Sequence, residues 1–117
     1  KEQGRVEMWI RRIELNLMTP VGMVWVHGSP LTKQVMKRQI PEVAEQNRGL
    51  VRGVFRFLDR RLADHEFLAG ATYSVADILL LCGMDFAAKL NDLPHSDEQK
   101  HLSRWYDAVS ARPSSSA

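Results

Sequence analysis

The side chains best suited to chemistry in this sequence are four histidines and one cysteine. The histidines are scattered, and none has metal-ligand spacing to another histidine or to the cysteine: His27, His65, His95, His101 and Cys82. Zinc sites use closely spaced Cys and His ligands, so we expect no metal site. Cys82 lies inside an apolar run, where a thiolate is poorly stabilised. We interpret it as a small buried packing residue rather than a nucleophile.

Asp77 is the remaining candidate for acid or base chemistry, but its surroundings give it a structural interpretation as well. It stands three residues after Ser74, at the start of an apolar run. A Ser followed by an acidic residue at this spacing forms a capping box, in which each side chain accepts a hydrogen bond from the other residue's backbone N–H. We favour this structural role for Ser74 and Asp77, because a cap contributes about 1 kcal/mol to a helix end.

The capping box opens a helix that we expect to be buried. Tyr73 before the cap and Ile78 after it have the spacing of a hydrophobic staple. The run from Ile78 to Leu81 is apolar on every face of a helix, and such a helix belongs inside a domain. We expect this helix over residues 75–90, with Asn91-Asp-Leu-Pro94 ending it.

Length and composition bound the possible functions. The 117 residues suit one domain with a core of its own, and 44% hydrophobic with 26% charged residues is ordinary for a globular protein. A net charge of +2 does not argue for nucleic acid or an anionic membrane as partner. No stretch is apolar enough for a membrane span, and no signal peptide is visible. A single cysteine excludes an internal disulfide and fits a cytoplasmic location. Because Lys1 is not an initiator Met, we expect a piece of a longer protein.

Residues 5–26 predict the first long helix. Apolar residues recur there at steps of three and four, which places them along one helix face: Val6, Ile10, Ile13, Leu17, Val21 and Val24. Further apolar residues widen this stripe, so the helix is expected to pack against more than one element. Pro20 lacks a backbone donor, and Thr19-Pro20 should kink the helix. The turn residues of His27-Gly-Ser-Pro30 should end it.

The rest of the chain predicts further helices. Residues 31–40 fit either a short helix or an irregular basic connector, and Pro41 suits the first position of a helix over 41–63. Gly49 and Gly53 lie on one face of that helix, where they could admit another backbone. A final helix is expected over 97–111, capped by Ser96, with Leu102, Trp105, Tyr106 and Val109 facing inward.

The sequence therefore predicts an all-α bundle of four to five helices over residues 1–113, followed by a disordered tail over 114–117. No β-hairpin signal, internal repeat or sustained heptad is present.

Two motifs also carry a resemblance to a known family. The pattern F-L-A-G-x-x-Y-S-V-A-D-I at residues 67–78, followed by W-Y-D-A-V-S-A-R-P at 105–113, resembles the C-terminal helical domain of glutathione S-transferases. In that family the S-x-x-D box opens the central helix of the domain, and an R-P pair closes the last conserved helix. The resemblance covers most of residues 5–113, and the W-I-R-R-I-E-L-N-L run of the first helix is similar to bacterial enzymes.

The resemblance implies roles for four residues. Arg11 resembles the polar residue that, in bacterial relatives, reaches glutathione bound to the neighbouring subunit. Met18 and Thr19 fall where those relatives line the pocket for the hydrophobic substrate, sometimes with a His-Lys pair that this sequence lacks. Phe86 matches an aromatic wall of that pocket. Ordinary core packing for Met18 and Phe86, and a solvated helix face for Arg11, remain open as alternatives.

The resemblance also implies what the chain lacks. In the family, a thioredoxin-like N-terminal domain binds the co-substrate glutathione and supplies the Ser, Tyr or Cys that activates its sulfur; no catalytic residue is therefore expected here. The leading hypothesis is the C-terminal domain of a cytosolic glutathione S-transferase that detoxifies small hydrophobic electrophiles as a homodimer, with the fragment itself inactive. The alternative is a non-catalytic transferase-like module for protein interaction.

Overall fold

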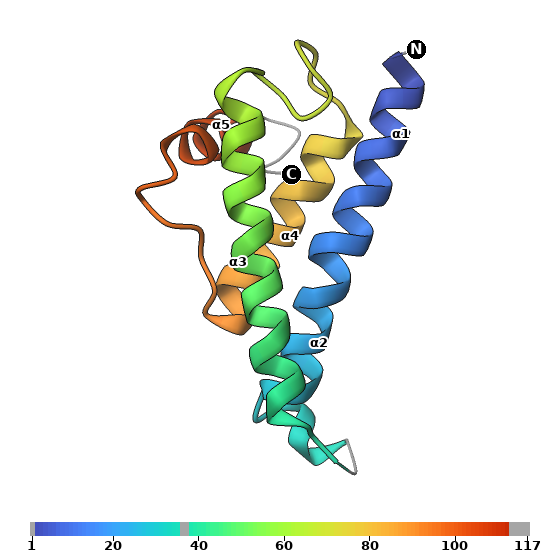
Figure 1. Ribbon diagram of the computed structural model, residues 1–117, viewed down its shortest axis with the longest axis vertical. Coiled ribbons are helices and arrows are strands. Elements are labelled where there is room, and N and C mark those ends of the chain that lie inside the picture. Colours follow the sequence, from blue (N-terminus) through green and yellow to red (C-terminus); the bar gives the residue numbers. More distant parts are fainter. Residues whose placement is uncertain (1, 36–37, 113–117) are drawn as a thin grey trace.

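The computed structural model describes residues 2–35 and 38–112, and all of its named elements are helical. In chain order these are α1 (Glu2–Ile13), a π-helical turn (Glu14–Met18), α2 (Thr19–Gly28), a 3-10 turn (Thr32–Gln34), α3 (Pro41–Ala63), α4 (Val75–Asn91) and α5 (Lys100–Ser110). Because α1, the π turn and α2 form one continuous rod, the molecule has four long helical segments (Figure 1). The predicted all-α bundle is confirmed.

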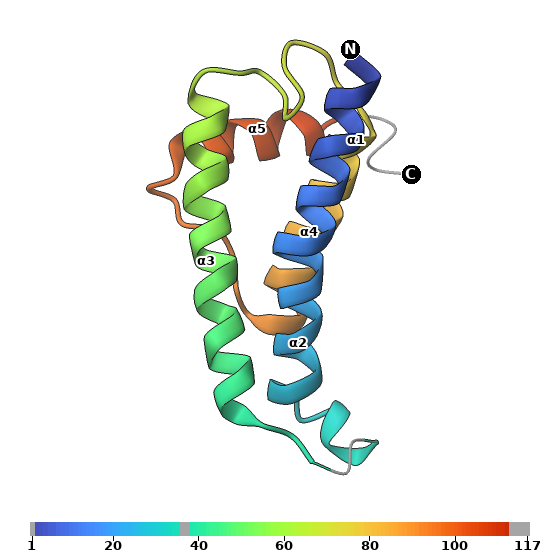
Figure 2. The same ribbon diagram turned by 45° about the vertical axis from the view of Figure 1, so that its right-hand side comes forward.

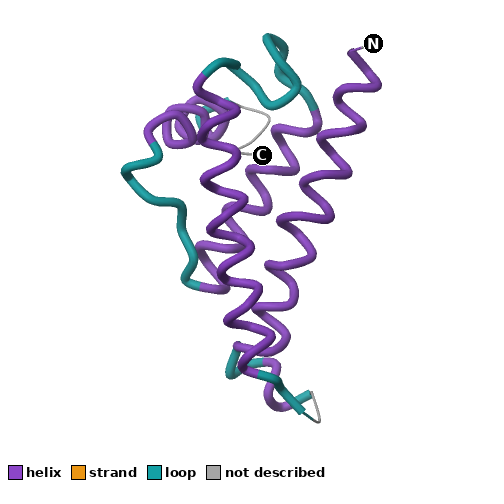
Figure 3. The backbone as a smooth tube through the Cα atoms, in the orientation of Figure 1, coloured by secondary structure: helices purple, strands orange, loops and turns teal. Residues whose placement is uncertain are grey.

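The helices form an elongated bundle of 45 × 29 × 28 Å. The α1–α2 rod runs the length of the molecule beside α3, and α4 packs against the rod (Figures 1 and 2). Helix α5 lies across the end of the bundle where the chain begins, and loops join the helices at both ends (Figures 2 and 3).

The predicted stripe of the first helix faces the core. Ile13, Leu17, Val21 and Val24 are at most 2% exposed. The irregularity predicted at Thr19-Pro20 takes the form of the π turn, in which the Thr19 backbone N–H bonds to the Glu14 carbonyl, five residues back. Pro20 has no N–H, and its ring disfavours the normal turn before it, so a widened turn is accommodated there.

Each helix contributes one apolar face to the core. Its largest fully buried side chains include Trp105, Phe55, Ile13, Leu17, Leu58, Leu62, Leu68, Leu80 and Leu102. Leu102, Trp105 and Val109 are buried as predicted, and Tyr106 packs half-buried against them. Pro41 occupies the first turn of α3 and Ala63 ends that helix, again as predicted.

The two glycines inside α3 differ from expectation. A Cβ at Gly49 would meet no heavy atom within 4 Å of the described chain, and one at Gly53 would meet only the Arg56 side chain at 3.6 Å. Neither glycine admits a backbone within this chain. The close approach occurs at Gly83 of α4, where a Cβ would lie 2.8 Å from Leu17 Cδ2 and 3.0 Å from Met18 Sδ. Gly83 is therefore the glycine that lets α4 and the π turn pack closely.

The prediction that α4 is buried on all faces is wrong. Leu80 and Leu81 are buried, but Val75 is 61% and Ile78 38% exposed, and the interpretation of Cys82 as buried fails because its side chain is also exposed. No described element covers this side of α4. The Tyr73 ring, predicted to pack on Ile78, meets Phe67 edge-on with centroids 5.8 Å apart.

The start of α5 also differs. Ser96 was expected to cap a helix from residue 97, but its Oγ accepts the Glu98 N–H in a local turn, and the helix begins at Lys100. Asp59 of α3 supplies the cap from outside, because its carboxylate accepts the Leu102 N–H at 2.9 Å. Pro113 and the tail predicted over 114–117 lie outside the described residues.

Candidate functional site

The capping box is the best-defined polar centre of the molecule. Ser74 begins α4, and the box with Asp77 is formed as predicted. Asp77 is fully buried, and its carboxylate accepts the backbone N–H of Ser74 at 3.0 Å. It also accepts the Leu68 N–H at 3.0 Å and Trp105 Nε1–H at 2.8 Å. These donors occupy both carboxylate oxygens, so Asp77 anchors a loop and two helices and is closed off from any substrate.

A groove of about 390 Å³ separates α1 from α3. Its lining is mostly apolar and includes Ile13, Gly49, Leu50, Gly53 and Phe57. Leu50 is 54% and Phe57 42% exposed, so the groove leaves large apolar side chains in solvent. An apolar surface of this kind marks a place where a partner packs.

Arginines gather around Trp9 at one end of this groove. The guanidinium carbons of Arg12 and Arg61 lie 5.1 and 5.0 Å from the Trp9 ring centroid, within cation–π range. Burial lowers the pKa of Arg61, and the charges of Arg5 and Arg12 lower that pKa further. Arg61 Nε donates to the Leu68 carbonyl at 3.1 Å, which holds it in place.

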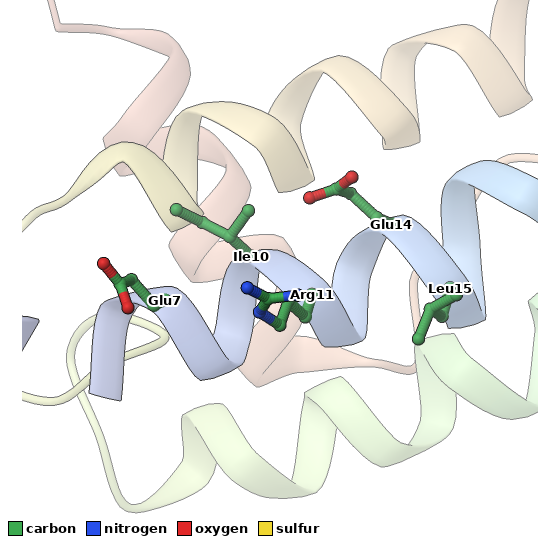
Figure 4. Close-up of a pocket in the computed structure, with 5 residues that line it drawn as sticks. All are labelled: Glu7, Ile10, Arg11, Glu14 and Leu15. Carbon is green, nitrogen blue, oxygen red and sulfur yellow. The ribbon is translucent and has the colours of Figure 1, made fainter. Parts of the chain in front are cut away.

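A second hollow, of about 420 Å³, lies along α1 and contains the predicted glutathione contact. It is lined by Glu7, Ile10, Arg11, Glu14 and Leu15. Figure 4 shows the Ile10 and Glu14 side chains pointing toward α4, whereas Arg11 and Leu15 lie on the outer surface of their helix. Glu7 and Glu14 are the carboxylates of this lining, and the Arg11 side chain lies on the outer surface of the helix, pointing away from Glu14.

The predicted substrate-pocket residues lie at the seam between the rod and α4. Met18 is half-buried and approaches α4 at Gly83. Phe86 is half-buried one helical turn further along α4 and packs against the core. Thr19 is exposed, and its hydroxyl donates to the Glu14 carbonyl at 3.0 Å. Met18 and Phe86 both pack against the core, and neither lines the two hollows described above.

Two polar contacts of α5 escaped prediction. Besides Trp105, whose Nε1–H reaches Asp77, the Tyr106 hydroxyl donates to Asp85 of α4. This hydrogen bond raises the pKa of Tyr106 to about 12, with burial adding to the shift. Both pairs join residues more than twenty positions apart, and no local spacing signals them. The polar edges of Trp105 and Tyr106 on a predicted inward stripe were the only available hint.

Residues 2–35 and 38–112 contain no cluster of three or more His, Cys, Asp or Glu side chains placed to hold a metal ion. None of their helices has the length and apolarity needed to cross a membrane.

A model of a known protein family matches this chain. The model for "Glutathione S-transferase, C-terminal domain" matches residues 22–113, which is most of the chain. The chain belongs to this family. The match ends at the Arg-Pro pair and includes the Ser74–Asp77 box, so the resemblance carried by these motifs is confirmed.

Individual relatives of this glutathione S-transferase C-terminal domain agree. The curated "Glutathione S-transferase 2" of Saccharomyces cerevisiae is 32% identical over 97% of the chain, and a "Probable glutathione S-transferase GSTF2" of Oryza sativa is 29% identical over 98%. The crystal structure of Gtt2 from S. cerevisiae superposes with a TM-score of 0.89 at 31% identity. It covers 97% of this chain and 54% of that one. A glutathione S-transferase domain-containing protein of Marinobacter aquaeolei gives 0.88 at 30% identity, with 97% and 56% covered.

The domain spans about half the length of these relatives: 48% of the yeast and 54% of the rice protein.

Proposed function

We propose that this chain is the C-terminal domain of a glutathione transferase and provides the hydrophobic electrophile pocket and the dimer interface for conjugating glutathione to electrophiles. The observation that carries the proposal is the match to yeast "Glutathione S-transferase 2", which extends over 97% of the chain but 48% of the relative. A protein that shares this domain at 32% identity is expected to share the remaining half as well.

The remaining half is proposed to be an N-terminal thioredoxin-like domain of the same protein. It would bind glutathione and stabilise its thiolate, which then attacks the electrophile. The exposed side of α4, with Val75 and Ile78, gives such a domain an apolar surface on which to pack. In this arrangement the chain contributes no catalytic residue and requires no metal.

The electrophile pocket is proposed at the seam of the rod and α4. Met18 of the rod approaches α4 at Gly83, Phe86 follows one helical turn later on α4, and both side chains keep part of their surface exposed. A thioether and an aromatic ring suit a loosely specific apolar pocket, because Met adapts its shape and Phe offers a flat wall. Thr19 adds a hydroxyl at the rim, although that hydroxyl already bonds to Glu14.

A homodimer is proposed to form over the groove between α1 and α3. Leu50 and Phe57 would be buried there, and the exposed Met8 of α1 and Leu15 of the π turn would extend the interface. Arg11 stands between Met8 and Leu15 in the sequence, so this pairing would bring it to the partner subunit, where we propose that it contacts glutathione. A stable interface of this kind buries about 800 Å² per subunit. The free thiol of Cys82 is compatible with the proposed cytoplasmic location.

The direct test is to compare the parent protein with the 117-residue chain. We expect the parent to bind glutathione and conjugate it to a chromogenic nitroaryl chloride, and the chain alone to do neither. A folded parent that neither binds glutathione nor catalyses conjugation would overturn the proposal and favour the non-catalytic interaction module.

A further inference from the structure

The connector between α2 and α3 is a surface that has no part in the proposed transferase. Its described residues, 29–35 and 38–40, lie at the end of the bundle opposite α5 (Figures 1 and 2). Three of its apolar side chains face solvent: Leu31 is 71%, Val35 82% and Ile40 36% exposed. They line neither of the hollows described above. The connector is therefore a projecting apolar tip rather than the wall of a groove.

Polar side chains of the connector are turned inward and fasten it to the end of α2. Thr32 is 3% exposed, and its hydroxyl donates to the Val26 carbonyl at 2.8 Å. Gln39 Nε2 donates to Thr32 Oγ1 at 2.8 Å, and the Ile40 N–H donates to His27 Nδ1 at 3.0 Å. Loops usually bury apolar and expose polar side chains, so this reversed arrangement marks an interaction surface.

The charge on this tip is one-sided. Lys33 and Arg38 are exposed and alternate along the chain with the apolar side chains. The sequence contains no Asp or Glu between His27 and Glu42. The net charge of the whole chain is only +2, but the local charge of this segment is purely basic. Apolar side chains interleaved with cations suit the boundary between the headgroups and the acyl chains of an anionic bilayer.

We propose that the connector docks this protein on an anionic lipid surface, with Leu31, Val35 and Ile40 among the acyl chains and Lys33 and Arg38 at the headgroup phosphates. A stable interface with another protein buries about 800 Å² on each side and needs a complementary surface. A narrow tip offers less area than that, whereas a fluid bilayer closes around a tip without a matched shape. The hydrogen bonds that fix the connector limit the entropy lost when it inserts.

Vesicle co-sedimentation of the 117-residue chain tests the proposal. Vesicles of mixed phosphatidylglycerol and phosphatidylcholine are compared with vesicles of phosphatidylcholine alone. We expect the chain to bind the anionic vesicles more tightly. Leu31→Ser with Val35→Ser should weaken this binding about tenfold or more, because it removes the inserted side chains. Lys33→Gln with Arg38→Gln should also weaken it about tenfold or more, by removing the charges that meet the headgroups.

Matched control variants remove the same kinds of side chain elsewhere. Val75→Ser removes an apolar side chain that is 61% exposed on α4, and Arg52→Gln with Arg56→Gln removes two exposed guanidiniums of α3. Both should leave vesicle binding nearly unchanged, and far-UV circular dichroism verifies that every variant is folded. A wild-type chain that does not bind anionic vesicles, or controls that lose as much binding as the connector variants, would overturn the proposal.

The single cysteine of the chain provides a second readout. Cys82 is exposed on α4, so a nitrobenzoxadiazole label on it reports that surface. The same label on Val35→Cys in a Cys82→Ser background reports the connector. We expect anionic vesicles to shift the emission of the connector label to the blue and to leave that of the α4 label unchanged. A shift of the α4 label alone would contradict the proposal. Both experiments omit glutathione, so their outcome is independent of conjugation by the parent.

Discussion

At the scale of single residues, Asp77 is the polar side chain that joins the most segments of the fold. Its carboxylate accepts hydrogen bonds from Leu68, Ser74 and Trp105 while fully buried. The bond to Ser74 could be predicted from local spacing, but those to Leu68 and Trp105 depend on how distant segments meet. The structural role that the sequence favours for Asp77 therefore extends beyond the capping box to contacts that its spacing does not indicate.

The substitution Asp77→Ala leaves two buried N–H donors without an acceptor, and each lost acceptor lowers the stability of the folded state. We expect a decrease of about 2–4 kcal/mol in the free energy of unfolding, measured by urea titration. Asp97→Ala, at an exposed position, is the control and should change stability little. Equal stabilities of the two variants would contradict the role assigned to Asp77.

Tyr106 predicts a pH effect at the same scale. Its pKa is raised to about 12 by the hydrogen bond to Asp85, from the 10.0 of an unperturbed tyrosine. A raised folded-state pKa means that the stabilisation is complete below pH 10.0 and is lost as the pH rises toward about 12. The urea midpoint of the wild type should therefore fall more steeply over this interval than that of Tyr106→Phe. Parallel decreases in the two proteins would show that Tyr106 does not contribute.

At the scale of elements, the amphipathic patterns predicted the positions of the helices. The cap residues predicted where some helices begin but not where others do. Pro41 and Ser74 mark the observed starts of α3 and α4. The start of α5 was misplaced because its cap comes from Asp59 on another helix. The exposure of Val75, Ile78 and Cys82 on α4 was not predicted either. The prediction assumed that every apolar residue of α4 packs inside this chain, whereas the described residues leave that side of α4 uncovered.

The glycines of two helices should respond oppositely to alanine. Gly83→Ala forces its Cβ against Leu17 and Met18, and we expect a loss of about 1–3 kcal/mol from overpacking. Gly49→Ala meets no neighbour in the chain and should gain about 0.5–1 kcal/mol from higher helix propensity. Thermal unfolding of both variants of the isolated chain measures the contrast, and a stabilising Gly83→Ala would contradict the packing described.

At the scale of the whole molecule, the domain leaves apolar side chains exposed in the α1–α3 groove and on α4, and it spans about half the length of the relatives it matches. The family and the fold were predictable from the box, the Arg-Pro pair and the helix pattern. The close packing of α4 on the π turn at Gly83 was not predictable, because no pattern in the sequence singled out that glycine.

Dimerisation of the parent should depend on the groove between α1 and α3. Leu50→Glu places a charge on this apolar surface, and sedimentation should show a shift from dimer to monomer. Leu31→Glu is the matched control, since Leu31 is 71% exposed and lies outside the groove. A dimer that survives Leu50→Glu but not Leu31→Glu would place the interface elsewhere.

We propose that this domain supplies the electrophile pocket of a glutathione transferase. Steady-state kinetics of the parent protein measure this contribution. Phe86→Ala should raise the KM for a nitroaryl chloride several-fold and leave the KM for glutathione unchanged, because it removes a wall that touches one substrate. Arg11→Gln should do the reverse. If Phe86→Ala leaves the electrophile KM unchanged, or raises the glutathione KM alone, the pocket is not where this account places it.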